Sequence, residues 1–284
     1  DGRPDIFVTN IFSGTGSADM SKDTGQAFEN RGEGHHGGRA KGNNLLINKP
    51  GAEFVDRAAE YGVRRTANLW GWAAVMTDLD NDGDPDLVHA NNEKNSITTG
   101  GGTSLVAKPT PPAAWEFVNG TFVSLDPLKL GFKKQDGRGM AQLDFDRDGD
   151  IDIAVANNEG AYRLYENQRR EPRGGITLFA DDDRNNALQV LVRGKETYLG
   201  HGARVRITVG DRTEHKFVTS KTDYLSQDSR VLHVGLGDHA TADRVVITWD
   251  DGSTLTLSDV AANQRLVVYP NGTVERIPLT VGSD

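Results

Sequence analysis

The chain has 284 residues, of which 36% are hydrophobic and 26% charged, so it is globular and has room for one large domain or two ordinary ones. Its net charge of −9 argues against a nucleic-acid partner, because proteins that bind nucleic acid present a basic surface. It has no apolar run of about 18 residues, so we expect no membrane span, and the lack of cysteine excludes disulfides and thiolate metal sites.

The chain begins inside an acidic turn, Asp1-Gly2-Arg3-Pro4-Asp5, followed by the strand-like Ile-Phe-Val-Thr-Asn10. Because it begins within a repeat, we expect further chain upstream. The next stretch, Ile11 to Lys41, is too long and too polar for a hairpin turn, and we interpret it as an excursion from one face of the fold. It contains His35 and His36, which are weak candidates for binding a ligand and are more simply explained as solvated loop residues.

Regular structure resumes at Asn44-Leu-Leu-Ile-Asn48, a predicted strand, and a second strand is predicted at Glu53-Phe-Val-Asp56. A helical turn is expected between Arg57 and Gly62. Trp70 and Trp72 follow within the next strand pattern. We interpret both tryptophans as packing residues, and the alternative is a platform on which a sugar stacks.

The most informative stretch is Asp78-Leu-Asp-Asn-Asp-Gly-Asp-Pro-Asp86, with carboxylates at positions 1, 3, 5 and 9 and a glycine at position 6. Carboxylates packed this closely repel one another unless a hard cation lies among them. Oxygen ligands at this spacing suit Ca²⁺, and the glycine permits the sharp turn. The pattern returns as Asp144-Phe-Asp-Arg-Asp-Gly-Asp-Ile-Asp152. The sequence therefore predicts two calcium loops, and the opening turn is part of a third.

An EF-hand loop begins in the same way but needs a bidentate Glu at position 12, between two helices. Position 12 is His89 in one copy and Val155 in the other, and the flanking residues are strand formers. Each loop is therefore expected to join two strands. The expected ligands are the side chains of positions 1, 3, 5 and 9 with the carbonyl of position 7: Asp78, Asp80, Asp82, Asp86 and Asp84; Asp144, Asp146, Asp148, Asp152 and Asp150; and, in the partial copy, Asp1 and Asp5.

Between and after the loops the chain repeats one plan. An irregular insert is expected from Glu93 to Ala114, and Asn119-Gly120 predicts a hairpin between strands at 115–118 and 121–124. A further strand is expected at 161–165. Units of this size cannot bury their faces alone and must stack on one another.

The loop motif, followed by Leu-Val-His-Ala-Asn-Asn92 in one copy and Ile-Ala-Val-Ala-Asn-Asn158 in the other, resembles the FG-GAP/VCBS type of β-propeller repeat found in the heads of integrin α-subunits. The resemblance covers residues 1–168 and implies propeller blades with structural calcium. Such propellers usually have more blades than the two and a half visible here, so the propeller is expected to be partial, with blades missing upstream; the alternative is that the ring closes with another segment.

Residues 169–175 form a plausible linker, after which alternating apolar and polar residues predict antiparallel strands. This second half, residues 169–284, resembles the ASPIC/UnbV domain and is expected to be a small β-sandwich-like domain. The resemblance rests on four segments: Gly200-His-Gly-Ala-Arg-Val205, Tyr224-Leu-Ser-Gln227, Leu232-His-Val-Gly-Leu-Gly237 and Val246-Ile-Thr-Trp-Asp-Asp-Gly252. The last departs from the family, which more often has W-P-x-G.

Calcium loops without a bidentate Glu are expected to bind weakly, so they would fill only where calcium is roughly millimolar. This indicates an extracytoplasmic location, whether secreted, cell-surface or periplasmic. We therefore expect an all-β recognition or assembly module, without enzymatic activity, that binds a protein or glycan partner through its propeller face and long inserts. The alternatives are a carbohydrate-active propeller enzyme with a site near the inserts, and a structural subunit of a homo- or hetero-oligomeric surface assembly.

Overall fold

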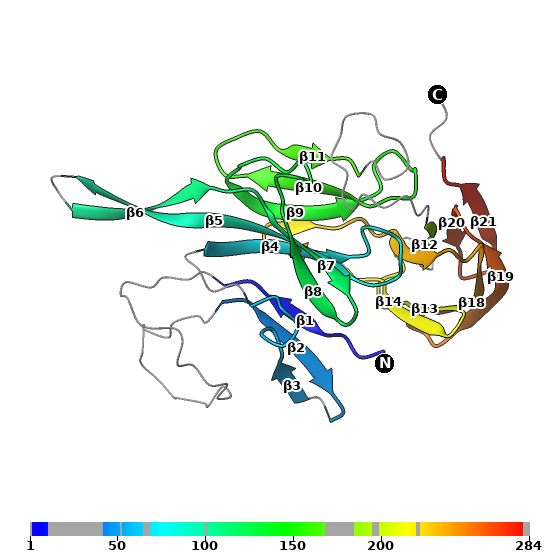
Figure 1. The fold of residues 1–284 in the computed structure, drawn as a ribbon. Coiled ribbons are helices and arrows are strands. Elements are labelled where there is room, and N and C mark those ends of the chain that lie inside the picture. The colour runs from blue at the N-terminus through cyan, green and yellow to red at the C-terminus, as the bar shows by residue number, and fades with distance from the viewer. Residues whose placement is uncertain are drawn as a thin grey trace.

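The protein is described by a computed structural model that covers residues 2–10, 42–51, 53–64, 69–99, 102–167, 185–194, 199–219 and 222–280. The described residues form five sheets of three to five strands and one two-stranded ribbon, and the predicted all-β class is confirmed (Figure 1). Each larger sheet has the size of one blade of a β-propeller. Within the described part of the chain, no helix has the length and hydropathy that crossing a membrane requires.

The first sheet contains the two strands predicted after the long polar stretch. Its order is β1 (Ile6–Val8), β2 (Asn44–Lys49) and β3 (Glu53–Asp56), with both pairs antiparallel. The predicted helical turn follows β3, where the amide of Tyr61 donates to the carbonyl of Arg57 over 3.0 Å. The polar stretch itself, with His35 and His36, lies outside the described residues, as does Asp1.

The second sheet has five strands: β4 (Leu69–Thr77), β5 (Asp86–Thr99), β6 (Gly102–Pro109), β7 (Ala113–Val118) and β8 (Thr121–Leu125). The irregular insert predicted between residues 93 and 114 was wrong, because β5 continues to Thr99 and pairs antiparallel with β6 as a long projecting ribbon (Figure 1). The β-branched run Ile97-Thr98-Thr99 favours an extended strand. The predicted hairpin of β7 and β8 is confirmed, with positive φ at Asn119 and Gly120.

The third sheet has the order β11 (Arg163–Tyr165), β10 (Asp152–Asn157) and β9 (Gly137–Leu143). It shares one apolar core with the second sheet, in which Val75 and Val88 pack with Met140 and Ile153. Because the two sheets are neighbours, the β4–β5 loop and the β9–β10 loop lie beside each other. Asn81 of the first loop donates to the Asp150 carboxylate of the second over 2.8 Å.

The rest of the chain forms two four-stranded sheets. One has the order β17 (Leu232–Gly237), β12 (Asn186–Val192), β20 (Gln264–Val268) and β21 (Val274–Pro278); the other has the order β14 (Arg212–Phe217), β13 (Arg204–Val209), β18 (Thr241–Thr248) and β19 (Thr254–Ala261). They pack face to face through a single core, as neighbouring blades also do. The pair β12–β20 is parallel, unlike the antiparallel pairing expected throughout. The long stretch of chain between these two strands supplies the crossover connection that parallel strands require.

These last two sheets are not set apart from the first three as a separate sandwich-like domain. The ribbon of β15 (Thr222–Asp223) and β16 (Ser226–Gln227) runs along the free edge of β9. There the hydroxyl of Ser226 donates to the carbonyl of Met140 over 2.6 Å, and the amide of Gln142 donates to Asp228 over 3.0 Å. The second half of the chain thus covers an edge strand of the third sheet, which would otherwise expose unpaired backbone groups. The predicted boundary at residue 168 lies outside the described residues.

Candidate metal centres

The two acidic loops have the same backbone and join consecutive strands, β4 to β5 and β9 to β10, as predicted. Position 4 has a left-handed conformation in both, with φ of 60° at Asn81 and 66° at Arg147. Position 6 is Gly83 or Gly149, each with φ of 95°, a value that residues with a Cβ adopt only with strain. These two left-handed residues wind each loop tightly enough to turn its carboxylates inward.

Three carboxylates come together in each loop, those at positions 1, 3 and 9. In the first loop each of the three offers an oxygen within 4.8 Å of the others, and the same holds in the second: Asp78, Asp80 and Asp86; Asp144, Asp146 and Asp152. The position-5 carboxylates are not members of these groups. Oδ1 of Asp82 accepts the amide of Asp84 over 2.7 Å, and Oδ1 of Asp148 accepts the amide of Asp150 over 2.8 Å.

The ninth-position carboxylate also holds the loop to a neighbouring strand. Oδ1 of Asp86 accepts the amide of Phe117 over 3.1 Å, and Oδ1 of Asp152 accepts the amide of Asn167 over 2.8 Å. Asp5, at the equivalent position of the partial copy, accepts the amide of Asn48 over 2.8 Å. Asp5 therefore accepts the same kind of hydrogen bond from a neighbouring strand as Asp86 and Asp152 accept in the full loops. Asp84 is exposed and Asp150 is buried, and the role predicted for their carbonyls stays a prediction.

The first carboxylate of each loop has one oxygen whose hydrogen-bonding capacity is unused. Oδ1 of Asp78 and Oδ1 of Asp144 are buried and have no hydrogen-bond partner, whereas the Oδ2 atom of each is bonded. Leaving a buried charged oxygen unsatisfied costs several kcal/mol of desolvation, roughly 1–3 or more. A cation among the three carboxylates would satisfy it. The two groups contain oxygen donors only, and such groups suit a hard metal ion.

The electrostatics of the loops also favour a cation. Burial, with repulsion from Asp80, raises the pKa of Asp86 to about 8, and it raises the pKa of Asp78 well above its usual range. Burial, with repulsion from Asp146, raises the pKa of Asp152 to about 7. Carboxylates in such surroundings would hold protons near neutral pH unless another positive charge took their place. A metal ion supplies that charge.

The first loop is bonded to strand β17 of the C-terminal sheets. The amide of Gly235 donates to Oδ2 of Asp78 over 3.0 Å, and the amide of Gly237 donates to the carbonyl of Asn81 over 2.8 Å. His233 Nε2 lies 2.6 Å from Asn81 Oδ1. A Cβ on Gly235 would lie 2.0 Å from Oδ2 of Asp78, so only glycine permits this approach.

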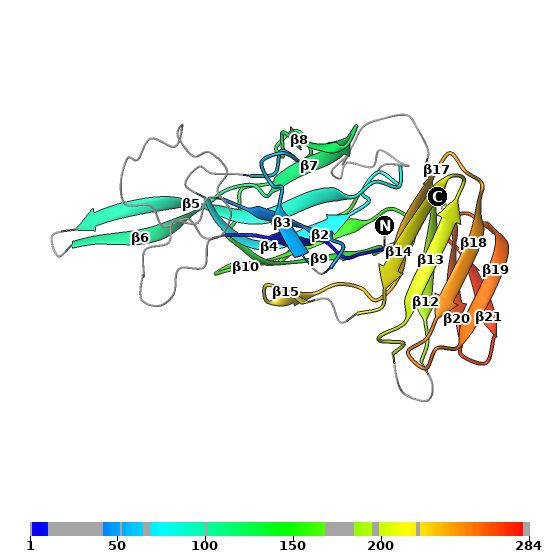
Figure 2. The ribbon, with the colours of Figure 1, turned by 90° about the horizontal axis from the view of Figure 1, so that it is seen from below.

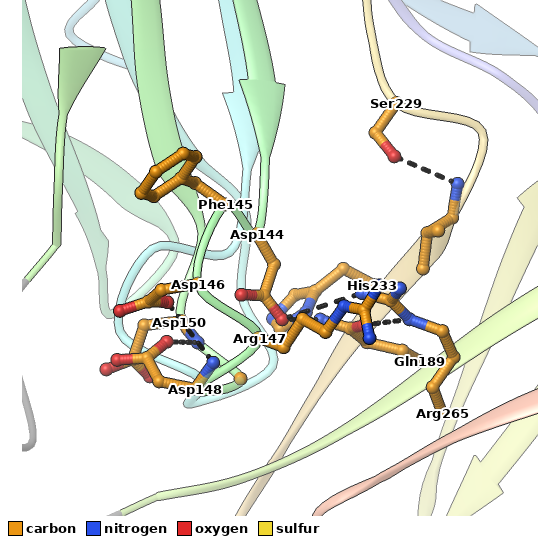
Figure 3. Close-up of polar contacts among 12 residues, drawn as sticks. Asp144, Phe145, Asp146, Arg147, Asp148, Asp150, Gln189, Ser229, His233 and Arg265 are labelled. Carbon is orange, nitrogen blue, oxygen red and sulfur yellow. Dashed lines mark hydrogen bonds and ion pairs between the residues drawn. The ribbon is translucent and has the colours of Figure 1, made fainter. Parts of the chain in front are cut away.

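The second loop is bonded to the same sheet through Gln189 of β12 and Arg265 of β20 (Figure 3), and also to Thr280, which follows β21. Gln189 Nε2 donates to Oδ2 of Asp144 over 2.5 Å, and the Arg265 guanidinium lies 3.8 Å from the same oxygen. Arg265 Nε also donates to Gln189 Oε1 over 2.8 Å. The amide of Thr280 donates to the carbonyl of Arg147 over 2.8 Å. One sheet therefore contacts both loops.

Sequence reasoning did not assign these four contact residues, His233, Gly235, Gln189 and Arg265, to the site. Gly235 lies within the Leu232–Gly237 segment that resembles the ASPIC/UnbV domain, but nothing in the segment indicated its partner. Gln189 carried a signal, since it is a fully buried amide in the otherwise apolar run Ala187-Leu-Gln-Val-Leu-Val192. A buried amide needs a polar partner, and here the partners are Asp144 and Arg265.

The two tryptophan candidates lie in β4, away from the loops. The ring of Trp72 is half-buried between Arg138, whose guanidinium carbon is 4.2 Å from the ring centroid, and Tyr224, whose ring centroid is 5.2 Å away. Its indole nitrogen donates to Asn92 over 2.6 Å. These contacts use the ring for packing. Trp70 is partly buried.

Comparison with known proteins supports one of the two resemblances. Residues 194–275 match the model of the ASPIC and UnbV family, which confirms the predicted relationship for that part of the chain. Over 129 residues the chain is 30% identical to cartilage acidic protein 1 of Xenopus tropicalis. This similarity takes in 43% of the chain and 18% of that relative, so the chain matches only a short part of it. The resemblance of the loops to FG-GAP/VCBS repeats remains a prediction.

Proposed function

We propose that this chain is an extracytoplasmic module for recognition or assembly, in which calcium ions held by two FG-GAP/VCBS-type loops fix the C-terminal sheets on the other three. The proposed partner is a protein or a glycan. The observation that carries the proposal is the position of Asp78. Its Oδ2 accepts the amides of Gly83 and Gly235, and its Oδ1 is buried without a partner. A cation on Oδ1 would make this carboxylate a bridge between the metal and the C-terminal sheets.

Calcium is the metal that this donor set favours. Each group provides several carboxylate oxygens from one loop, and Ca²⁺ accepts six to eight oxygen ligands in variable geometry, whereas Mg²⁺ requires a near-ideal octahedron and gives up water reluctantly. In the first loop Asp82 and Asp84 lie between Asp80 and Asp86 in the sequence, and we propose the Asp82 carboxylate and the Asp84 carbonyl as further ligands. Filling weak sites of this type requires calcium near the millimolar range, which supports an extracytoplasmic location.

Calorimetric titration of the metal-free chain with calcium, and separately with magnesium, tests this proposal. Two calcium ions are expected to bind, with magnesium much weaker. Asp78→Asn, which removes the charge of the bridging carboxylate, should abolish one of the two binding events. Asp126→Asn is the matched control, because this aspartate lies in a turn outside both loops. Failure of the wild-type chain to bind calcium would overturn the proposal.

A further inference from the structure

The outer face of the sheet β14–β13–β18–β19 has an unusual composition. Residues opposite one another in the strand register share this face: Phe217, Arg204, Thr248 and Thr254 in one row; His215, Arg206, Val246 and Thr256 in the next; and Thr213, Thr208, Arg244 and Ser258 in the third. We call these twelve residues the arginine face. It carries three arginines and one histidine and no carboxylate, in a chain whose net charge is −9.

The three arginines are available to a partner. Arg204, Arg206 and Arg244 are exposed, and none of the ion pairs found among the described residues involves them. On the inward side of the same sheet, by contrast, the cations are paired with a carboxylate. Glu214 of β14 lies 3.5 Å from Arg212 and 3.0 Å from Lys216. The two inward cations thus share a carboxylate, whereas the three arginines of the outer face belong to none of the ion pairs of the described residues.

The arginine face is also hollowed. An open hollow of about 300 Å³ has among its lining residues Arg204, Arg206, His215, Phe217, Val246 and Thr248 of this face. The N-terminal segment borders it, since the His215 ring lies 3.1 Å from the place where a Cβ of Gly2 would stand. Figure 2 shows β14 beside the N-terminus, with β13 and β18 next to it. The hollow thus combines guanidinium groups, one aromatic ring and a hydroxyl.

We propose that the arginine face binds an anionic polysaccharide, one that carries sulfate or carboxylate groups. This inference names a partner class and a face for the proposed recognition role, and rests on that role. Guanidinium groups bind sulfate and carboxylate through two parallel hydrogen bonds. Arg204 and Arg206, two residues apart on one strand, are separated by about 7 Å, and Arg206 and Arg244, diagonal neighbours on adjacent strands, by roughly 7–8 Å, so the face can contact several charges along one chain.

The hydroxyls favour a carbohydrate over an acidic peptide. The face carries six threonine or serine side chains, at positions 208, 213, 248, 254, 256 and 258, which can hydrogen-bond to sugar hydroxyls between the charged groups. An extended peptide is usually bound at a sheet edge, where free backbone groups pair with it. The three arginines lie on the two central strands of the sheet, β13 and β18, where a ligand meets side chains and no free backbone edge.

The test is surface-plasmon-resonance binding of the calcium-loaded chain to immobilised heparin, with dextran, polyglutamate and single-stranded DNA as comparison probes. The variant Arg204→Ser/Arg206→Ser removes two charges from the face. The matched control, Lys133→Ser/Arg276→Ser, removes two exposed cations elsewhere and leaves the same net charge. Heparin is expected to bind and dextran not, and the face variant should bind heparin roughly tenfold more weakly or worse, with the control unchanged.

Equal loss in both double variants would overturn the proposal, because attraction would then follow net charge alone. A second contrary outcome is that polyglutamate or DNA binds as tightly as heparin and is weakened equally by Arg204→Ser/Arg206→Ser. That result would show that the face binds polyanions in general and would overturn the assignment to a polysaccharide. Absence of heparin binding by the wild-type chain would also overturn it. Calcium titration of the same face variant separates this inference from the proposed calcium role, since the variant should bind calcium normally.

Discussion

The backbone amide of Gly235 donates a hydrogen bond of 3.0 Å to Oδ2 of Asp78, a residue 157 positions earlier in the chain. Asp78 is the first carboxylate of an acidic loop between two strands of the second sheet, and Gly235 lies in the middle of β17. The group that would hold a metal ion therefore also holds the C-terminal sheets. Through this link, a bound metal and the packing of the sheets would depend on each other.

Gly235→Ala tests the close approach directly. Its Cβ would lie 2.0 Å from Oδ2 of Asp78 and 2.5 Å from the backbone of Asn81, so β17 or the loop must move. Overpacking of this kind typically costs about 1–3 kcal/mol, and we expect such a loss in urea unfolding with calcium present. Gly160→Ala is the control, because the added Cβ would meet only a Cβ at 3.7 Å. Equal stability of the two variants would show that β17 is not held against the loop.

Asp78→Asn and Asp82→Asn are expected to differ. The Asp78 carboxylate is buried in the group of three, whereas the Asp82 carboxylate is exposed and accepts the amide of Asp84. Calcium at a hundredfold excess over its dissociation constant raises the free energy of unfolding by about 2.7 kcal/mol per site. Asp78→Asn should lose the stabilisation that one site provides, and Asp82→Asn should lose less. Thermal unfolding of each variant with calcium and with chelator measures the difference.

In chelator, the unfolding midpoint should rise as the pH is lowered from about 9 to about 6. Burial raises the pKa of Asp86 and of Asp148 to about 8 and that of Asp152 to about 7. Between the unfolded value of 3.8 and these raised values, the folded state holds more protons than the unfolded state, so its stability increases as pH falls.

Calcium should cancel this pH dependence, or reverse it, because the metal replaces the protons and is itself displaced by them at low pH. The measurement is a set of thermal scans across the same pH range with and without calcium. A metal-free chain whose midpoint falls steadily between pH 9 and pH 6 would contradict the assignment of raised pKa values to these carboxylates.

The two loops should differ in calcium affinity. In the second loop the guanidinium of Arg265 lies 3.8 Å from Asp144, whereas in the first loop the Oδ2 atom of Asp78 accepts two neutral amides. A cation close to a ligand opposes a second cation. Arg265→Met keeps the apolar stem and removes the charge, and it should tighten the weaker of two calorimetric binding events several-fold. An unchanged or weakened second event would show that Arg265 does not compete.

Much of the strand pattern and the position of both loops could be predicted from sequence, because alternation and turn glycines act over short distances. Asn119-Gly120 and the glycines at position 6 needed only their neighbours to be interpreted. Asp82 and Asp148 each use one oxygen to accept the amide two residues ahead, a contact that the motif alone does not reveal. The ligand role expected of these two side chains stays a prediction.

The contacts between the two halves could not be predicted, because they join residues far apart in the chain. Gln189 pairs with Asp144, and Ser226 pairs with the backbone of Met140 on the edge of β9. The long β5–β6 ribbon was also missed, since its turn glycines and polar residues are typical of irregular structure as well as of an exposed hairpin. Each of these features depends on tertiary contacts rather than on local pattern.

Amide hydrogen exchange at Gly235 and Gly237, measured by nuclear magnetic resonance with calcium and then with chelator, tests the central claim most directly. Both amides donate to the first loop, one to Asp78 and the other to Asn81. We predict slow exchange with calcium and much faster exchange after chelation, while amides in the β13–β18 pair remain protected. Equally slow exchange at both glycines in the two conditions, in a chain that binds calcium, would contradict the claim that the metal fixes the C-terminal sheets.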